Sequence, residues 1–240
     1  MSTLVVIPAR MASVRFPGKP LVLLNGRPMI EWVYRAAVES EVGPVVIATP
    51  DAEIAQAAQG FGAAVEMTRA DHPSGTDRLA EIADRTEFQG YINVQGDEPL
   101  IEPATIRACA QTLDSGADVG SLFAVCDPAD IENPAVVKVV LTATLRALYF
   151  SRALIPYPRN APTRPTYRHV GIYAFRREAL QAFATLPPSP LEQTEGLEQL
   201  RFLEHGFTIQ MAPSPEIAFG VDTPDQATIA DRMLRARIAE

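Results

Sequence analysis

The sequence contains few of the residues from which disulfide frameworks, zinc sites and membrane spans are built. Its 240 residues include two cysteines, Cys109 and Cys126, whose spacing matches neither a disulfide framework nor a zinc site. We expect both to be small buried apolar residues. No apolar run reaches the roughly 20 residues that a transmembrane helix needs, and residues 1–3 lack the basic segment of a signal peptide. The sequence therefore predicts a cytoplasmic protein without a membrane partner.

Two common nucleotide-binding patterns are also missing. The chain has no GxxxxGK[ST] loop, and its Gly60-Phe61-Gly62 segment follows a predicted helix instead of a strand, which disfavours kinase and dehydrogenase functions. A net charge of −8 argues against a nucleic-acid partner. Positive charge is nevertheless concentrated within residues 1–35, where five cationic side chains accompany one acidic side chain. This asymmetry favours a small anionic ligand.

The length and the hydrophobic pattern predict one α/β domain spanning residues 1–240. At the start of the chain, apolar runs typical of strands alternate with helix-forming stretches. This alternation predicts a βαβαβ unit with parallel strands. The expected fold is an open, Rossmann-like mixed sheet, mostly parallel and flanked by helices, with a small β-hairpin lobe at about 134–156. Strands are predicted at 4–7, 45–49, 64–68, 91–94, 119–125, 136–141, 147–151 and 168–173, and helices at 28–40, 51–61 (capped by Asp51), 77–85, 103–114, 191–205 and 224–238.

The stretch LVVIPARMASVRFPGKPL (4–21) joins a predicted buried strand to a cationic loop. Ligands of open α/β sheets bind beyond the carboxyl ends of the strands, which is where Arg10, Arg15 and Lys19 would lie. Prolines stiffen this loop, and Gly18 allows its backbone to approach a ligand closely. The three cations predict a polyanion receptor suited to a triphosphate. The alternative is three solvated surface charges.

Two further loops carry candidate ligands. Asp97 follows the predicted strand 91–94 beside a glycine, a position suited to hold Mg²⁺ against phosphate oxygens, although a solvated Asp-Glu turn has the same pattern. Its neighbour Glu98 would point to the opposite face of an extended chain. Ser74 and Gly75 precede a predicted helix and can present backbone N–H groups to an anion or a base edge. A plain helix cap explains them equally well.

Asp222 lies next to a predicted helix start. Thr223, Pro224 and Gln226 form a capping-box pattern that does not require Asp222. The proline-rich stretch 155–165 is predicted to lack regular structure.

The chain resembles the sugar-activating nucleotidyltransferases, and among them most closely the 3-deoxy-manno-octulosonate (Kdo) cytidylyltransferases. The resemblance spans nearly the whole sequence, in order. It rests on the stretch 4–21 and on MTRADHPSGTDRLAE (67–81), NVQGDEPLI (93–101), NPAVVKVVL (133–141), ALYFSRALIP (147–156), RHVGIYAF (168–175), PSPLEQTEGLEQLRFLEHG (188–206) and GVDTP (220–224). The stretch 155–165 is shorter than the family pattern, which bears on the shape of the sugar pocket.

This resemblance implies transfer of CMP from CTP to the anomeric hydroxyl of Kdo, with release of pyrophosphate, in lipopolysaccharide biosynthesis. It implies a homodimer, with the hairpin as the contact, and Mg²⁺ bound by Asp97 and Asp222. These two residues, Arg10 and Lys19 would be catalytic. The implied CTP-binding residues are Ala9, Arg10, Ser13, Arg15, Lys19, Ser74, Gly75, Arg78 and Gln95. The implied sugar-binding residues are Gln95, Arg152, His169, Tyr173, Glu198 and Gln199, with a solvated charge as the alternative for Arg152.

Three alternatives to this function stay open at the level of the sequence. CMP-sialic acid synthetases share the Ala-Arg start and use a related 2-keto acid sugar, although the stretches 95–101 and 188–193 favour Kdo. A Kdo analogue would fit the same motifs, because one hydrogen-bonding group can decide between such substrates. A nucleotide-binding sensor without catalysis would need the cationic loop but not both Asp97 and Asp222. No side chain is identified as a general base.

Overall fold

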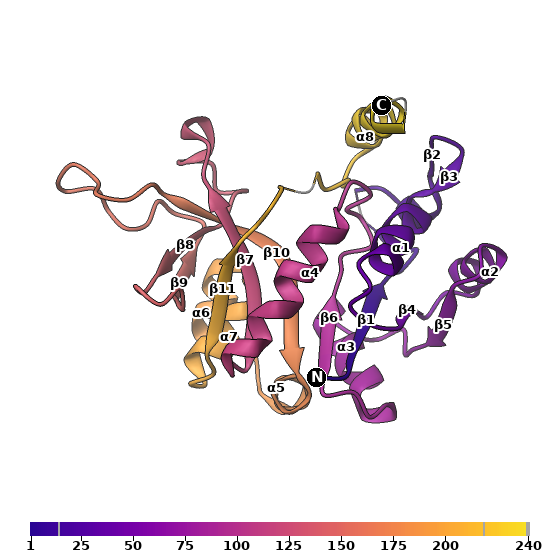
Figure 1. Cartoon of the computed structure of the whole chain (residues 1–240), viewed down its shortest axis with the longest axis horizontal. Helices are drawn as coiled ribbons and strands as arrows, with labels where there is room; N and C mark the ends of the chain where they lie inside the picture. The colour runs from indigo at the N-terminus through magenta and orange to yellow at the C-terminus, as the bar shows by residue number, and fades with distance from the viewer. Residues whose placement is uncertain (14, 218, 239–240) are drawn as a thin grey trace.

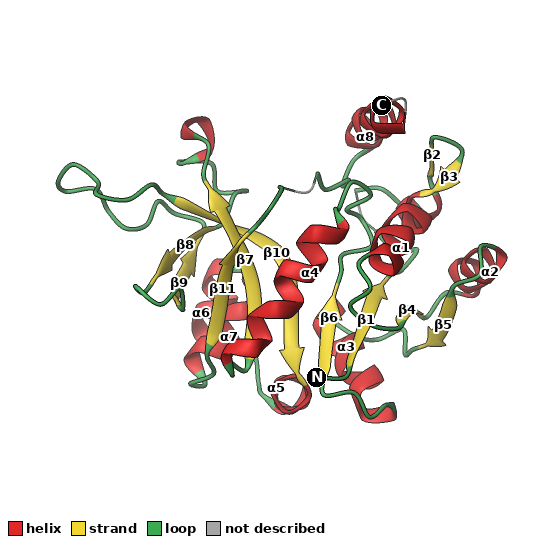
Figure 2. Cartoon of the chain, in the orientation of Figure 1, coloured by secondary structure: helices red, strands yellow, loops and turns green. Residues whose placement is uncertain are grey.

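A long mixed sheet forms the frame of the molecule. The computed structural model describes residues 1–13, 15–217 and 219–238. Among these, nine strands form one sheet in the order β11-β7-β10-β6-β1-β4-β5, with the β8–β9 hairpin joined to β10 (Figures 1 and 2). The strands are β1 (Thr3–Pro8), β4 (Val45–Thr49), β5 (Ala64–Met67), β6 (Gly90–Asn93), β7 (Val119–Val125), β8 (Lys138–Leu141), β9 (Ala147–Ser151), β10 (Tyr167–Arg176) and β11 (Ile209–Pro213).

One half of the sheet is parallel and places several loops at one edge. Strands β6, β1, β4 and β5 run parallel to one another. The predicted βαβαβ unit is therefore confirmed, with α1 (Met29–Glu39) and α2 (Ala52–Gly60) as its helices. Because parallel strands end at the same edge, the segments that follow β1, β6, β4 and β5 converge there. The helix α3 (Gly75–Arg85) begins at this edge.

The other half of the sheet contains antiparallel pairs. β10 runs antiparallel to both β6 and β7, whereas β11 is parallel to β7. The predicted hairpin is present, and β8 also pairs with β10, so the hairpin continues the sheet. The hairpin and the proline-rich loop 152–166 extend at the end of the molecule opposite to α2 (Figure 1).

Alternating side chains of the strands build one apolar core on each face of the sheet. Leu4 and Val6 of β1 pack on one face with α3, α5 (Arg177–Thr185) and α7 (Gln199–Glu204). Val5 and Ile7 pack on the other face with α1, α2 and α4 (Pro103–Gln111). This alternation explains why the run 4–7 is apolar throughout: both of its faces are buried.

The carboxyl-terminal helix α8 (Pro224–Ile238) returns to the start of the chain. Ala227, Ala230 and Leu234 pack with Leu24 and Met29, and α8 lies beside the small hairpin of β2 (Leu23–Leu24) and β3 (Arg27–Pro28) (Figure 1). The predicted capping box is present. Gln226 N donates to Thr223 Oγ1 (3.3 Å) and Thr223 N donates to Gln226 Oε1 (3.1 Å).

Two predicted helices differ from the structure. The stretch 191–205 is not one helix: α6 (Pro190–Glu195) ends at Gly196, whose φ of +63° stops the helix, and α7 starts at Gln199. The predicted helix 103–114 ends earlier, at Gln111, and a 3₁₀ turn over Thr112–Ser115 follows it. Across the described residues, no helix combines the length and apolar character needed to cross a membrane.

We predict that the backbone of β7 cannot accept a side chain at Gly120. A Cβ atom there would lie 1.6 Å from Oγ1 of the buried Thr112 and 2.7 Å from its Cβ. We expect Gly120→Ala to lower the free energy of unfolding by about 3 kcal/mol, the upper end for overpacked cores. Gly171→Ala in β10 is the control, because nothing lies within 4 Å of its added Cβ, and its effect should stay within about 0.5 kcal/mol. Urea unfolding measures both, and equal effects of the two variants would contradict the packing argument.

Candidate active site

The converging loops enclose a cavity of about 440 Å³ at the carboxyl edge of the parallel strands. Its walls consist of the segments that follow β1 and β6, the start of α3 and the residues that precede α8. The structure brings together all the residues predicted to bind CTP, along with both predicted metal ligands. The cavity is lined by Pro8, Ala9, Arg10, Ala12, Ser13, Arg15, Lys19, Pro20, Ser74, Gly75, Arg78, Gln95, Gly96, Asp97 and Asp222.

A single ammonium group links the two carboxylates. Lys19 Nζ lies 2.5 Å from Asp97 Oδ2 and 3.0 Å from Asp222 Oδ1, and it also donates to Val221 O. Arg15 adds a second cation 3.0 Å from Asp222. Burial opposes the charge of Lys19, but the two carboxylates outweigh this effect and raise its pKa above the ordinary value. Lys19 therefore stays protonated, and its charge is available to neutralise an anion.

The cationic loop is fixed at its base by an interaction that the sequence did not predict. Asp51 precedes α2 as expected, but its carboxylate makes no capping hydrogen bond to that helix. Asp51 Oδ2 instead accepts the Met11 N–H at 2.7 Å, and Gly18 N donates to Met11 O at 3.0 Å. The cap prediction for this side chain is therefore wrong. The Gly18–Met11 bond closes the cationic loop, and Asp51 holds Met11 in place through a contact across 40 residues that no local pattern signals.

A second, smaller cavity of about 220 Å³ adjoins the first. Gly75 and Gln95 line both cavities. Four of the residues predicted to bind sugar meet here: Gln95, Tyr173, Glu198 and Gln199. Gly75, predicted to bind CTP, also lines it. The sequence analysis did not select the other lining residues, which are Thr76, Asn93, Phe175, Gly196, Leu197 and Phe202.

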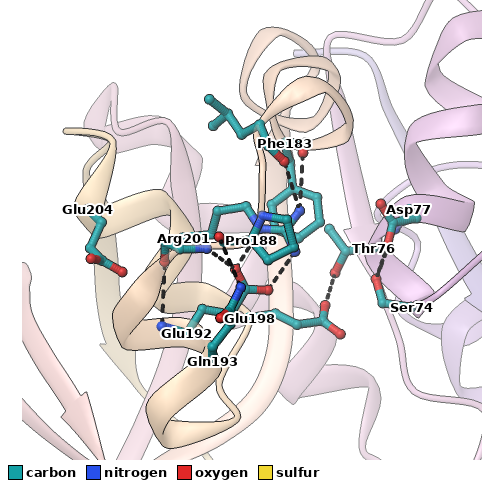
Figure 3. A network of polar contacts seen from close by, with 12 residues as sticks. Ser74, Thr76, Asp77, Phe183, Pro188, Glu192, Gln193, Glu198, Arg201 and Glu204 are labelled. Atoms are coloured by element: carbon teal, nitrogen blue, oxygen red, sulfur yellow. Dashed lines mark hydrogen bonds and ion pairs between the residues drawn. The ribbon is translucent and has the colours of Figure 1, made fainter.

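The turn between α6 and α7 carries the acidic group of the second cavity. Thr76 Oγ1 donates to Glu198 Oε2 at 2.9 Å, and Arg201 pairs with Glu192 through two nitrogens, at 2.5 and 2.7 Å (Figure 3). Partial burial of the carboxylate raises the pKa of Glu198, and its hydrogen bond with Thr76 opposes that rise. Burial also raises the pKa of Tyr173, which therefore keeps its proton. The cavity thus offers hydroxyl, amide and carboxyl groups.

Two predicted sugar-binding residues are not among those lining the second cavity. His169 Nε2 lies 2.9 Å from Ser121 Oγ, and its ring packs against Phe150 and Tyr173. Burial, together with the charge of Arg168, lowers the pKa of His169 to about 3, so the imidazole is neutral. Arg152 donates to the carbonyl groups of Pro134, Glu195 and Gly196. Because Gly196 lines the cavity, the guanidinium group of Arg152 lies next to its wall.

Glu98 has different surroundings from its neighbour Asp97. It does not belong to the group that lines the first cavity, but the chain turns at 96–97, where Glu98 N donates to Gln95 O, so the extended backbone assumed in the prediction is not present. Burial and the charge of Asp97 raise its pKa to about 7. Its Oε2 atom is buried and has no hydrogen-bond partner within the described part of the chain, as is also true of Asn93 Oδ1.

The fold and this site define a class of protein. A loop bearing several cations, two convergent carboxylates and an adjoining polar cavity suit a nucleoside triphosphate and a hydroxylated acceptor placed side by side. Such an arrangement at the carboxyl edge of a parallel sheet is that of a nucleotidyltransferase.

Comparisons with known proteins identify the family. A model of the cytidylyltransferase family matches residues 4–209, and the chain belongs to this family. It is 46% identical over 248 residues to the 3-deoxy-manno-octulosonate cytidylyltransferase of Syntrophotalea carbinolica, covering 98% of this chain and 99% of that protein. The enzyme of the same name from Escherichia coli is 46% identical over 223 residues, covering 92% of this chain and 91% of that protein.

Solved structures agree with this assignment. A CMP:2-keto-3-deoxy-manno-octonic acid synthetase in complex with CTP is 42% identical and superposes with a TM-score of 0.95, covering 99% of this chain and 100% of that one. A glucose-1-phosphate thymidylyltransferase homologue from Bacillus anthracis, in complex with sucrose, is 14% identical with a TM-score of 0.70, covering 98% of this chain and 96% of that one. The latter shows a shared fold alone.

We predict that Asp51 supports nucleotide binding from outside the cavity. Loss of a hydrogen bond to a charged acceptor, worth roughly 1.5–3 kcal/mol, would free the loop that starts at Met11. We expect Asp51→Ala to raise the dissociation constant for CTP about tenfold, because the loop must then be ordered on binding. The control is Glu53→Ala, which eliminates an exposed carboxylate of the same helix. It should leave the dissociation constant for CTP unchanged. Calorimetric titration with CTP makes the comparison, and an equal CTP affinity in both variants would rule out the supporting role.

Proposed function

We propose that the chain transfers CMP from CTP to the anomeric hydroxyl of Kdo and releases pyrophosphate. The observation that carries this proposal is the meeting, in one cavity, of the cationic loop with Asp97 and Asp222. The near full-length likeness to enzymes named for this reaction supports it. The product, CMP-Kdo, would activate the sugar for lipopolysaccharide synthesis, and the availability of CTP favours the cytoplasm as the place of action.

In the proposed complex, the triphosphate lies along the cationic loop. Arg10, Arg15 and Lys19 neutralise its phosphate oxygens, while the loop before α3, with Ser74 and Gly75, contacts the cytidine. The backbone N–H groups at the start of α3 favour a hydrogen-bond acceptor there. Kdo occupies the adjoining cavity, where Gln95, Tyr173, Glu198 and Gln199 contact its hydroxyl groups. Gln95 borders both substrates because it lines both cavities.

The reaction is a substitution at the α-phosphorus. The anomeric oxygen forms the new O–P bond, the bond to the bridging oxygen of pyrophosphate breaks, and the proton of the anomeric hydroxyl passes to solvent. Lys19 is unsuited to accept that proton because its pKa is raised and it stays charged. Its role is to neutralise charge that develops on the phosphate groups. Positioning of the substrates and charge neutralisation supply the acceleration.

Asp97 and Asp222 fit a magnesium site completed by substrate. Both carboxylates reach within 3.0 Å of one cation, Lys19 Nζ, so they are close enough to share another. The described residues contain no cluster of three or more His, Cys, Asp or Glu side chains able to hold a metal ion by themselves. Mg²⁺ commonly takes one or two carboxylates together with substrate phosphates and water. When bound, it would polarise the α-phosphate.

The test of the function is pyrophosphate release from CTP and Mg²⁺ with Kdo, with N-acetylneuraminate and with no sugar. We expect release with Kdo alone, and its loss on chelation of Mg²⁺. Asp97→Asn should lower kcat at least a hundredfold, because it removes one charged ligand of the proposed metal. Asp225→Asn is the matched control, since Asp225 lies in the first turn of α8 but is not among the residues lining the cavity.

Each other outcome has a distinct meaning. Release with N-acetylneuraminate in place of Kdo would keep the reaction and change the substrate. CTP binding without release from any sugar would overturn the transferase proposal for these substrates and favour a nucleotide sensor. Full activity in excess chelator would remove magnesium from the proposal.

We further propose a homodimer that uses the β8–β9 hairpin. This end of the molecule exposes large apolar side chains: Leu148 is 60% exposed and Tyr157 is 83% exposed. An apolar groove of about 560 Å³ lies between the hairpin and the proline-rich loop, lined among others by Val139, Leu141 and Pro156. Exposed apolar surface of this kind is typical of an interface between subunits.

We predict that a charge placed on this hairpin separates the subunits. Leu148→Arg should shift the mass measured by sedimentation velocity from dimer to monomer, because an unpaired charge would be buried in the interface. Leu23→Arg, at an apolar residue that is 64% exposed in β2, should remain a dimer. A monomeric unmodified chain, or a dimer that survives Leu148→Arg, would contradict this interface.

A further inference from the structure

The two cavities share one structural wall, the first turn of α3. Ser74 caps this helix by accepting the N–H of Asp77, and it lines the nucleotide cavity. Gly75 lines both cavities, and Thr76, the next residue, lines the sugar cavity. One helical turn therefore presents consecutive residues to the two proposed substrates.

Thr76 connects this turn to the opposite wall of the sugar cavity. Its side chain is buried, and its hydroxyl donates to Glu198 Oε2 across 122 residues of sequence (Figure 3). A buried β-branched side chain has few rotamers, so the direction of this hydroxyl follows the backbone of the turn. The position of the Glu198 carboxylate thus depends on the position of the first turn of α3.

The rest of the network leaves Glu198 dependent on α3. Arg201 lies close enough to Glu198 for their charges to interact. However, its Nε and Nη2 atoms donate to Glu192, and its guanidinium group stacks 4.0 Å from the centre of the Phe183 ring (Figure 3). Glu192 also accepts the N–H of Ser189 in a capping box, so it is fixed from both sides. This ion pair anchors α7 to α6, while the polar groups that act on Glu198 from the start of α3 are the Thr76 hydroxyl, which donates to it, and the nearby Ser74 hydroxyl.

We propose that Thr76 is a positioning residue that couples occupation of the nucleotide cavity to binding of the sugar. The inference rests on the proposed function of the two cavities. A nucleotide that contacts Ser74 and Gly75 fixes the turn, and the Thr76 hydroxyl then holds the Glu198 carboxylate toward the sugar hydroxyls. Ordering of one site by the ligand of the other is a coupling free energy, and it acts equally in both directions.

The test measures sugar affinity with and without a nucleotide that cannot react. The probe is a CTP analogue with a methylene group in place of the oxygen that bridges the α- and β-phosphorus atoms. Calorimetry gives the dissociation constant of Kdo in each condition. For the unmodified protein we expect the analogue to lower that constant at least fivefold, the lower end of typical coupling.

Variants of Thr76 identify the group responsible. Thr76→Val keeps the shape and removes the hydroxyl, so the analogue should change its Kdo dissociation constant less than twofold. Thr76→Ser restores the donor and should recover most of the coupling. Thr228→Val removes an exposed hydroxyl from α8 and should behave as the unmodified protein. Thermal unfolding checks that each variant is folded.

Several results would overturn the inference. A Thr76→Val variant with the coupling of the unmodified protein would do so. So would a variant that binds Kdo more weakly by the same factor in both conditions, because that result indicates direct contact between Thr76 and the sugar. Absence of Kdo binding to the unmodified protein in either condition would instead remove the proposed function.

Discussion

The site depends on the bridge that Lys19 forms between Asp97 and Asp222. The three residues come from the start, middle and end of the chain, and Lys19 is separated from its partners by 78 and 203 positions. Two carboxylates held this close repel one another unless a cation lies between them. Lys19 supplies that cation in this structure, and its own positive charge is maintained by the same contacts. The proposed Mg²⁺ would have to share these carboxylates with Lys19, so its arrival with a nucleotide would rearrange charges that are already paired.

The sheet explains how such distant residues meet. Both faces of β1 are buried, and its neighbours on either side run parallel to it. Their carboxyl ends therefore deliver the cationic loop and Asp97 to one edge. Asp222 reaches this edge because α8 packs against Leu24 and Met29, near the start of the chain. The apolar contacts of α8 thus have a direct consequence for the charged site.

Local patterns in the sequence predicted much of the fold and the cationic loop, whereas the family resemblance supplied most of the other residues expected to line the nucleotide cavity. The bounds of β4, β7 and β9 match the predicted strands, and the capping box of α8 is present. The two errors differ in cause. Asp51 has the pattern of a helix cap, but a distant N–H, that of Met11, binds its carboxylate. Helical periodicity continues through Gly196, whereas the backbone there is left-handed. The contact of Asp51 with Met11 has no signature in the neighbouring residues, whereas Gly196 is itself a local signal for the end of a helix, which the periodic apolar pattern around it concealed.

The two cavities differ in charge, and this difference bears on how a sugar acid is recognised. Arg10, Arg15, Lys19 and Arg78 line the nucleotide cavity, whereas the described lining of the second cavity includes Glu198 and no cation. In the proposed complex, a sugar carboxylate would therefore lie at the border of the second cavity, away from Glu198. Arg152 is beside that border, where its hydrogen bond to the carbonyl of Gly196 holds it at 3.3 Å. The turn that ends α6 thus sets the place of both charges, with Glu198 in the lining of the cavity and Arg152 outside the wall.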